Sequence, residues 1–186
     1  MAPKGRFFAF EPLPEFYKKL SASFTSPPVK VFNLALSDRE DVVSFNYVVS
    51  NPAYSGLRKR RYDRPNEADC TITVPTDRLD AIIGEHDHVD FIKIDVEGAE
   101  LQVLRGGVRT INRCKPVIVF EHGIGAADCY GTKPEQVYDL LCDECGLRIS
   151  LLDNWLVGRQ PLSREGFCEQ FNKGLNYYFI AHPISL

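Results

Sequence analysis

Short apolar runs alternate with segments of helical periodicity along the whole chain. Strands are predicted where β-branched and aromatic residues cluster, at 5–12, 29–38, 41–50, the first part of 70–83, 89–95, 116–121, 148–153 and 175–183. Helical spacing is found at 14–24, at the end of 70–83, at 97–107 and at 133–146. Strands that alternate with helices indicate an α/β domain with a largely parallel sheet and helices on both of its faces.

The chain length and charge narrow the class of protein. Its 186 residues fit one domain with a substantial core. The net charge of −3 implies no general attraction to nucleic acid or to an anionic membrane. No apolar run is long enough to span a bilayer, and the first residues do not form a signal peptide. We therefore expect a cytoplasmic protein whose six cysteines are reduced thiols, including the Cys142–Cys145 pair, which lacks a second pair of zinc ligands.

Polar residues follow several of the predicted strands. In an open α/β sheet, ligands bind beyond the carboxyl ends of the strands. The residues at that rim are Glu11, Ser37 or Asp38, Asp95, Glu97, Glu121 and His122. We therefore expect a ligand site along this edge.

Each rim acid also has a simpler interpretation. A carboxylate after a strand, such as Glu11, is the type of residue that binds a ribose diol, but it can equally be a solvated strand end. Glu97 and Glu100 lie in the first turn of a predicted helix, where acids interact favourably with the helix dipole. Asp95 is the stronger candidate because it falls at the last predicted buried position of its strand.

A basic segment interrupts the pattern between two of the strands. Residues 51–69, here called the flap, are polar, contain Gly and Pro, and include the run RKRR at 58–61. The flap is either a substrate-recognition element for a phosphate or an acidic sugar, or a solvated loop. Lys93 lies within the predicted buried strand, so we expect it to pair with Glu121 or Glu11.

Three segments carry a family resemblance. The stretch FIKIDVEGAELQVLRGG at 91–107, with FAFEPLPEFYKKL upstream and PVIVFEHG downstream, resembles the FkbM family of S-adenosylmethionine-dependent methyltransferases. The resemblance extends to SGLRKR at 55–60 and to the closing YYFIAHP. It implies a Rossmann-like class I methyltransferase fold and O-methylation of a small-molecule hydroxyl, often on a sugar.

The resemblance also implies roles for individual residues. Glu11 would hold the ribose of S-adenosylmethionine, Ser37 and Asp38 would approach the adenine, and Asp95 would lie near the methyl group. Ser55, Arg58 and Arg60 of the flap would bind the acceptor. His122 is the first candidate for a general base, with a strand-capping histidine as the alternative. Asp95, Glu97 and Glu121 could share the task of the base or hold a divalent cation.

The N-terminal end departs from the family pattern. Family members begin with a strand and a glycine-rich turn, Asp-x-Gly-Ala-Asn-x-Gly, whereas only Met1 to Lys4 precede the first strand here. We therefore expect the first strand, its helix and the main cofactor loop to be missing. Leaving a row of buried backbone groups unpaired costs about 1–3 kcal/mol for each group. The gap between the strands at 6–10 and 90–95 could be filled by direct pairing, by a second chain as in a strand-swapped homodimer, or by a native N-terminal piece outside this chain. We expect one of the first two.

Two functions from different classes fit these features. The first is an S-adenosylmethionine-dependent O-methyltransferase. The second is a non-catalytic remnant or interaction module that keeps the fold without binding the cofactor. The rim acids favour the first function, and the missing glycine-rich turn favours the second.

Overall fold

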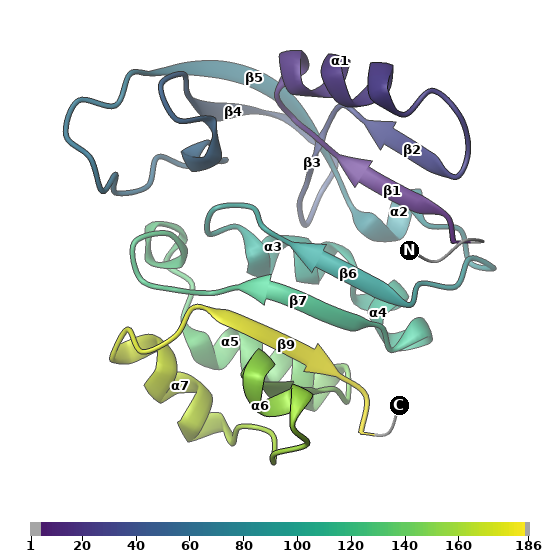
Figure 1. Cartoon of the computed structure of the whole chain (residues 1–186), viewed down its shortest axis with the longest axis vertical. Coiled ribbons are helices and arrows are strands. Elements are labelled where there is room, and N and C mark those ends of the chain that lie inside the picture. Colours follow the sequence, from purple (N-terminus) through teal and green to yellow (C-terminus); the bar gives the residue numbers. More distant parts are fainter. Residues whose placement is uncertain (1–4, 185–186) are drawn as a thin grey trace.

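The computed structural model describes residues 5–184, so Met1 to Lys4, where the N-terminal departure was noted, lie outside the described residues. The strands form three sheets (Figure 1). The first contains β1 (Phe7–Phe10) and β2 (Val29–Phe32). The second has the order β3-β5-β4, from Ala35–Leu36, Asp69–Asp77 and Asp41–Val48. The third has the order β6-β7-β9-β8, from Phe91–Ile94, Val117–Glu121, Tyr178–His182 and Arg148–Ser150.

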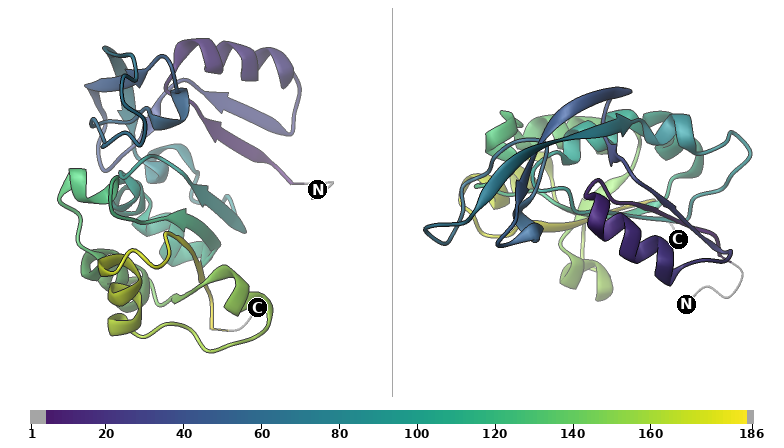
Figure 2. Two further views of the ribbon diagram at one scale, coloured as in Figure 1. Left: turned by 60° about the vertical axis from the view of Figure 1, so that its left-hand side comes forward. Right: turned by 90° about the horizontal axis from the view of Figure 1, so that it is seen from above.

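Short helices connect and cover the strands. The α-helices are α1 (Pro14–Ser23), α2 (Leu79–Ile82), α3 (Glu100–Gly106), α4 (Val108–Cys114), α5 (Pro134–Tyr138), α6 (Leu152–Leu156) and α7 (Arg164–Asn172). Two 3₁₀ turns, η1 (Pro52–Tyr54) and η2 (Ala127–Tyr130), and a π-helical turn, η3 (Asp139–Glu144), complete the set. Figure 2 shows α6 on the opposite side of the third sheet from α2, α3 and α4.

The α/β class is confirmed, but the sheets are mixed. Parallel pairing joins β1 with β2, β3 with β5 and β6 with β7. Antiparallel pairing joins β4 with β5, β7 with β9 and β8 with β9. The run at 29–38 divides into two strands because the Asn33 amide donates to the carbonyls of Glu11 and Pro12 and turns the chain.

Direct pairing between the strands at 6–10 and 90–95 does not occur. In Figure 1, β1 and β6 point in the same direction, yet they belong to different sheets. Within residues 5–184, β1 pairs only with β2, and β6 pairs only with β7. The expectation of direct pairing is therefore wrong, and pairing with a second chain stays a prediction.

Two apolar clusters stabilise the fold. The larger one lies between the third sheet and helices α3, α4, α5 and α7, and it includes Leu104, Ile118, Phe120, Leu141 and Phe167, all with essentially no exposed surface. A smaller cluster of Leu13, Ala35, Phe45 and Val74 lies in the N-terminal half. The third sheet is therefore the better-packed part of the molecule.

One face of β6 is open. Ile94 is buried, but Phe91 is 58% exposed, and the side chain of Lys93 is 59% exposed. Lys93 Nζ lies 2.5 Å from Asp95 Oδ2, so the expected pairing with Glu121 or Glu11 is wrong. Because its ammonium group remains in water, Lys93 needs no deeper partner.

Candidate functional site

The candidate site lies where the loop after β6, the flap and η2 meet. The flap extends from the end of β4 to the start of β5, to which Asp69 already belongs (Figure 1). Its base is held by Ser55, whose Oγ accepts a hydrogen bond from Val48 N–H at 3.0 Å. Further along, Asn46 and Gly56 exchange backbone hydrogen bonds of 2.8 and 3.1 Å. Ser55 therefore helps to hold the base of the flap, and its binding to an acceptor stays a prediction.

The flap rests on the rim through two of its arginines. Arg60 forms an ion pair with Glu97, and their side chains are only 16% and 14% exposed. Arg58 N–H donates to the Tyr130 hydroxyl at 2.9 Å, and Arg58 Nη1 donates to the Cys129 carbonyl at 3.2 Å. The structure thus pairs Arg60, for which acceptor binding was predicted, with Glu97, a candidate base, and it holds Arg58 on η2.

The Glu97 carboxyl lies in a partly dry environment. Burial raises its pKa, and the neighbouring Arg60 guanidinium offsets this by a smaller amount. The nearby Glu121 and Asp95 carboxylates raise the pKa further. A carboxylate with a raised pKa is better suited to accept a proton than a fully solvated one.

A cavity of about 220 Å³ adjoins this junction. Ser37, Asp38, Arg58, Gln102 and Tyr130 contribute to its wall. Within the described residues, Gln102 Oε1 is buried without a hydrogen-bond partner. The cavity therefore joins two of the predicted cofactor residues, Ser37 and Asp38, to one predicted acceptor residue, Arg58.

Glu11 lies at the end of β1, as predicted, but outside this cavity. One of its carboxylate oxygens accepts the Leu13 N–H at 2.8 Å. Half-burial raises the pKa of Glu11, and the bond from Leu13 lowers it by less. A carboxylate fixed in this way keeps its other oxygen for a hydroxyl group.

The remaining rim acids are already engaged. Asp95 is ion-paired with Lys93. Glu121 lies beside Tyr178 and, chiefly by accepting its hydrogen bond, raises the pKa of that phenol to about 12. Among residues 5–184, no group of three or more His, Cys, Asp or Glu side chains is arranged to hold a metal ion.

His122 has a different environment from the other rim residues. Its side chain is 1% exposed and stacks on Phe171 and Phe167, with ring centroids 4.6 and 5.8 Å away. Neither ring nitrogen has a hydrogen-bond partner within the described residues, and burial lowers the pKa to about 4. This placement favours the structural alternative over a general base.

Glu100 is the residue whose place the sequence did not indicate. An acid in the first turn of a helix suggests a solvated partner of the dipole, yet Glu100 is only 1% exposed. Its Oε1 accepts Gly98 N–H at 2.9 Å, and burial raises its pKa to about 7. The neighbouring apolar residues Ala99 and Leu101, both buried, were the available signal.

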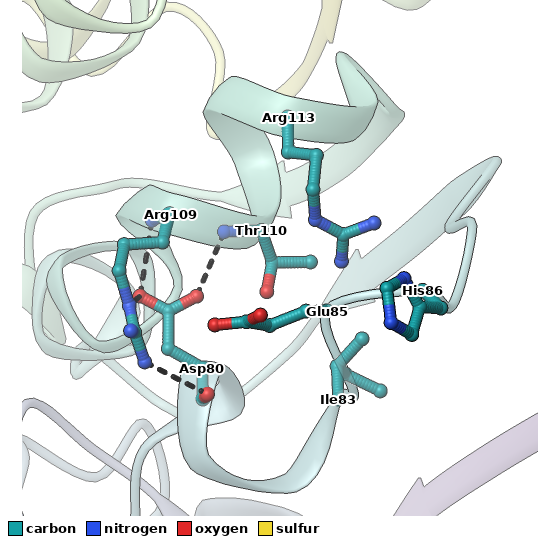
Figure 3. Close-up of a pocket in the computed structure, with 7 residues that line it drawn as sticks. All are labelled: Asp80, Ile83, Glu85, His86, Arg109, Thr110 and Arg113. Atoms are coloured by element: carbon teal, nitrogen blue, oxygen red, sulfur yellow. Dashed lines mark hydrogen bonds and ion pairs between the residues drawn. The ribbon is translucent and has the colours of Figure 1, made fainter.

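A second cavity of about 320 Å³ lies near the start of β6, away from the rim (Figure 3). Asp80 at its wall accepts Arg109 N–H at 3.0 Å and Thr110 N–H at 2.8 Å. Arg113 donates to the carbonyls of Asp87 and Gly84. These groups satisfy one another and tie α2 and the 84–87 turn to α4, so this cavity has a structural explanation.

Comparison with known proteins identifies the family. The Methyltransferase FkbM domain matches residues 1–149, which include β1, the flap and the β6–α3 loop. The chain belongs to the FkbM methyltransferase family.

Two curated proteins and one solved structure are similar to this FkbM chain. The hexuronic acid methyltransferase AglP of Haloferax volcanii is 30% identical over 165 residues, which cover 84% of this chain and 63% of AglP. The AMB antimetabolite synthetase AmbE of Pseudomonas aeruginosa is 30% identical over 140 residues, 56% of this chain and 7% of AmbE. The chain therefore spans less than two thirds of either relative.

The fold is also found in an FkbM methyltransferase from Methylobacillus flagellatus KT. The TM-score is 0.54 at 16% identity, over 95% of this chain and 36% of the other. This likeness supports the overall arrangement of the strands and helices. In the described part of the FkbM chain, no helix is long and apolar enough to cross a membrane.

Proposed function

We propose that this FkbM chain is an S-adenosylmethionine-dependent O-methyltransferase that acts on a hydroxyl of a sugar acid. The observation that carries the proposal is the ion pair between Glu97 and Arg60 of the flap, close to a cavity whose wall includes Arg58, Ser37 and Asp38. Methyl transfer requires the acceptor and the cofactor to be held in line, which a cleft between two elements favours. The name of the AglP relative supports a hexuronic acid as the acceptor.

The residues present fit parts of the cofactor. Glu11 has a carboxylate oxygen suited to a ribose hydroxyl, and Ser37 and Asp38 line a cavity large enough for a ring system such as adenine. At about 220 Å³ the cavity is smaller than the roughly 300 Å³ at which small-molecule sites begin, so it would take a portion of the cofactor. When bound, S-adenosylmethionine supplies an activated methyl group on a sulfonium.

The chain's own residues would then bind and deprotonate the acceptor. Within the described residues, the Arg58 guanidinium contacts a carbonyl and an aromatic ring and no carboxylate, so it can bind a carboxylate of the acceptor. Glu97 would take the hydroxyl proton on its carboxylate, aided by its raised pKa. Asp95 and Glu121 would reinforce the negative potential that keeps this proton on Glu97.

A calorimetric titration with S-adenosylhomocysteine tests cofactor binding. Binding with micromolar affinity, about −8 kcal/mol, that is lost in Glu11→Ala and Asp95→Ala would support the proposal. Glu144→Ala, an exposed acid far along the chain, is the matched control. Absence of binding up to millimolar concentration would contradict cofactor binding by this chain.

Methyl transfer to a hexuronate and to the matching neutral hexose tests the acceptor. Arg58→Ala should lower kcat/KM for the hexuronate at least tenfold and leave that for the hexose unchanged, because one charge-assisted hydrogen bond is lost. Arg61→Ala changes a neighbouring exposed arginine of the flap and should leave both substrates unaffected. Equal turnover of the two sugars would refute the acid preference while keeping the methyltransferase.

A non-catalytic interaction module is the second candidate. The small cavity favours it, and so do the edges of β1 and β6 that have no strand partner within residues 5–184. We propose that a second copy of the chain supplies a strand to these edges, because strand edges bind other strands readily. Light scattering that finds only monomer would remove the exchanged dimer.

A further inference from the structure

The backbone between β6 and α3 has an unusual conformation. Glu97 has φ of 55° and Gly98 has φ of 104°, both in the left-handed region. A residue other than glycine rarely adopts such an angle unless its surroundings enforce it. At Gly98 the reason for glycine is steric, because an added Cβ would lie 2.4 Å from the Ala126 carbonyl oxygen.

The buried carboxyl group of Glu100 holds this turn by a hydrogen bond. Glu100 Oε1 accepts the Gly98 N–H at 2.9 Å, while the side chain is almost completely removed from solvent. Within residues 5–184, no cation forms an ion pair with Glu100. Burying a carboxyl group without a cation is costly, and the hydrogen bonds that offset this cost come from the Gly98 N–H and from the backbone N–H of Glu100 itself. The first of these bonds ties the side chain to the turn.

The Glu97–Gly98 turn directs the Glu97 side chain toward the flap. Glu97 forms its ion pair with Arg60, and an added Cβ at Gly56 would lie 3.4 Å from both Glu97 Cβ and the Tyr130 hydroxyl. The flap therefore rests closely on the turn. A continuous series of contacts runs from Glu100 through Gly98 and Glu97 to Arg60.

We propose that Glu100 is a positioning residue that fixes the Glu97–Gly98 turn and thereby keeps the flap docked on the candidate active site. Glu100 does not touch the acceptor; it acts through the direction in which Glu97 points. The docked flap carries Arg58 to the wall of the cavity. This role concerns the flap itself and does not depend on the identity of the acceptor or on cofactor binding.

Limited trypsin digestion of the folded protein tests the proposal directly. The flap offers trypsin four consecutive sites at residues 58–61, and cleavage there reports how often the flap leaves the rim. Glu100→Gln and Glu100→Met form a matched pair, since both have similar length and no charge, but only the amide can accept the Gly98 N–H. Glu144→Ala serves as the control for the loss of an exposed acid.

We expect flap cleavage at least tenfold faster in Glu100→Met than in the wild type, and within threefold of the wild type in Glu100→Gln. Glu97→Ala should match Glu100→Met, and the double variant should be cleaved no faster than either, because both changes break one series of contacts. If Glu100→Met folds and its flap is cleaved at the wild-type rate, the proposal is wrong.

Two further measurements keep the test decisive if Glu100→Met does not fold. Glu97→Ala should then show accelerated cleavage of the flap, and Arg60→Gln should show accelerated cleavage at the three sites that remain in the run. The Gly98 amide should remain protected from hydrogen exchange in Glu100→Gln. Wild-type cleavage in both variants, or an unprotected Gly98 amide, would overturn the proposal. With an acceptor in hand, loss of Glu97–Arg60 contact should raise KM for the acceptor without changing the affinity for S-adenosylhomocysteine.

Discussion

The loops that follow β6 and β7 start from the same pattern and reach opposite environments. Each strand is apolar and continues into acidic residues and a glycine, through Asp95 to Gly98 in one case and Glu121 to Gly123 in the other. After β6 the chain makes a polar turn against the flap, with Glu97 facing Arg60. After β7 the next residue, His122, is enclosed by aromatic rings of α7.

The difference comes from the element that covers each strand end. The flap lies over the end of β6, whereas α7, which carries Phe167 and Phe171, lies over the end of β7. Burial favours the neutral form of both Glu100 and His122, but the ionised form of Glu100 is negative and that of His122 is positive. Glu100 and His122 should therefore respond to pH in opposite directions.

The largest effect should come from adding one methyl group at the turn after β6. Gly98→Ala places a carbon against the Ala126 carbonyl and also strains φ, so the free energy of unfolding should fall by about 3 kcal/mol or more. Gly125→Ala is the control, because Gly125 has φ of 99° but no atom within 4 Å of the added carbon. It should cost about 1–2 kcal/mol. If urea denaturation shows that Gly98→Ala and Gly125→Ala lower the free energy of unfolding equally, the close contact at Gly98 is unimportant.

Glu100 should make the wild type less stable as the pH rises. Its pKa is raised from 4.5 to about 7, so between these values the folded state keeps a proton that the unfolded state releases. From pH 5 to pH 8 the wild type should lose about 2–3 kcal/mol relative to Glu100→Gln. Urea titrations at the two pH values measure this difference, and parallel pH curves would contradict it.

His122 should act in the other direction. Its pKa is lowered from 6.5 to about 4, so as the pH falls below 6.5 the unfolded state takes up a proton that the folded state refuses. Between pH 7.5 and pH 5 the wild type should lose about 2 kcal/mol of stability relative to His122→Leu, because the variant lacks this group. His86→Leu, at an exposed position, is the control. If His122→Leu loses as much stability at acid pH as the wild type does, a group other than His122 causes the loss.

The smallest effect should be the coupling between Glu97 and Arg60. Both side chains are mostly buried but lie near the surface, so a double-mutant cycle of Glu97→Gln and Arg60→Gln should give about 1–2 kcal/mol. High salt should reduce this value only slightly, because the pair is partly shielded from solvent. Coupling near zero would mean that the pair does not stabilise the docked flap.

Much of the strand and helix pattern could be predicted because it depends on local periodicity. The apolar runs at β6 and β7, and the helix that begins near Glu100, are where the sequence placed them. The family was likewise recognisable from the 91–107 stretch. These features depend on residues that are close in the sequence, so they can be recognised from one sequence.

The errors came from contacts that are distant in the sequence. Lys93 was assigned a deep partner because its strand resembles one buried on both faces, but one face of β6 is open. The burial of Glu100 had a local signal in its apolar neighbours Ala99 and Leu101, which the helix-dipole interpretation overlooked. The aromatic enclosure of His122 has no such signal, since it depends on α7, for which no helix was predicted. The pairing of β1 with β2 alone depends on packing across the whole chain.

The hairpin that carries the flap has an evolutionary consequence. β4 and β5 pair continuously from Asp41–Thr76 to Val48–Asp69, so the flap extends from a stiff support rather than from the core. Its length and residues can change while the strands below keep their register. An acceptor preference encoded in such an extension is modular: one scaffold could serve many different acceptors by exchanging a single surface loop.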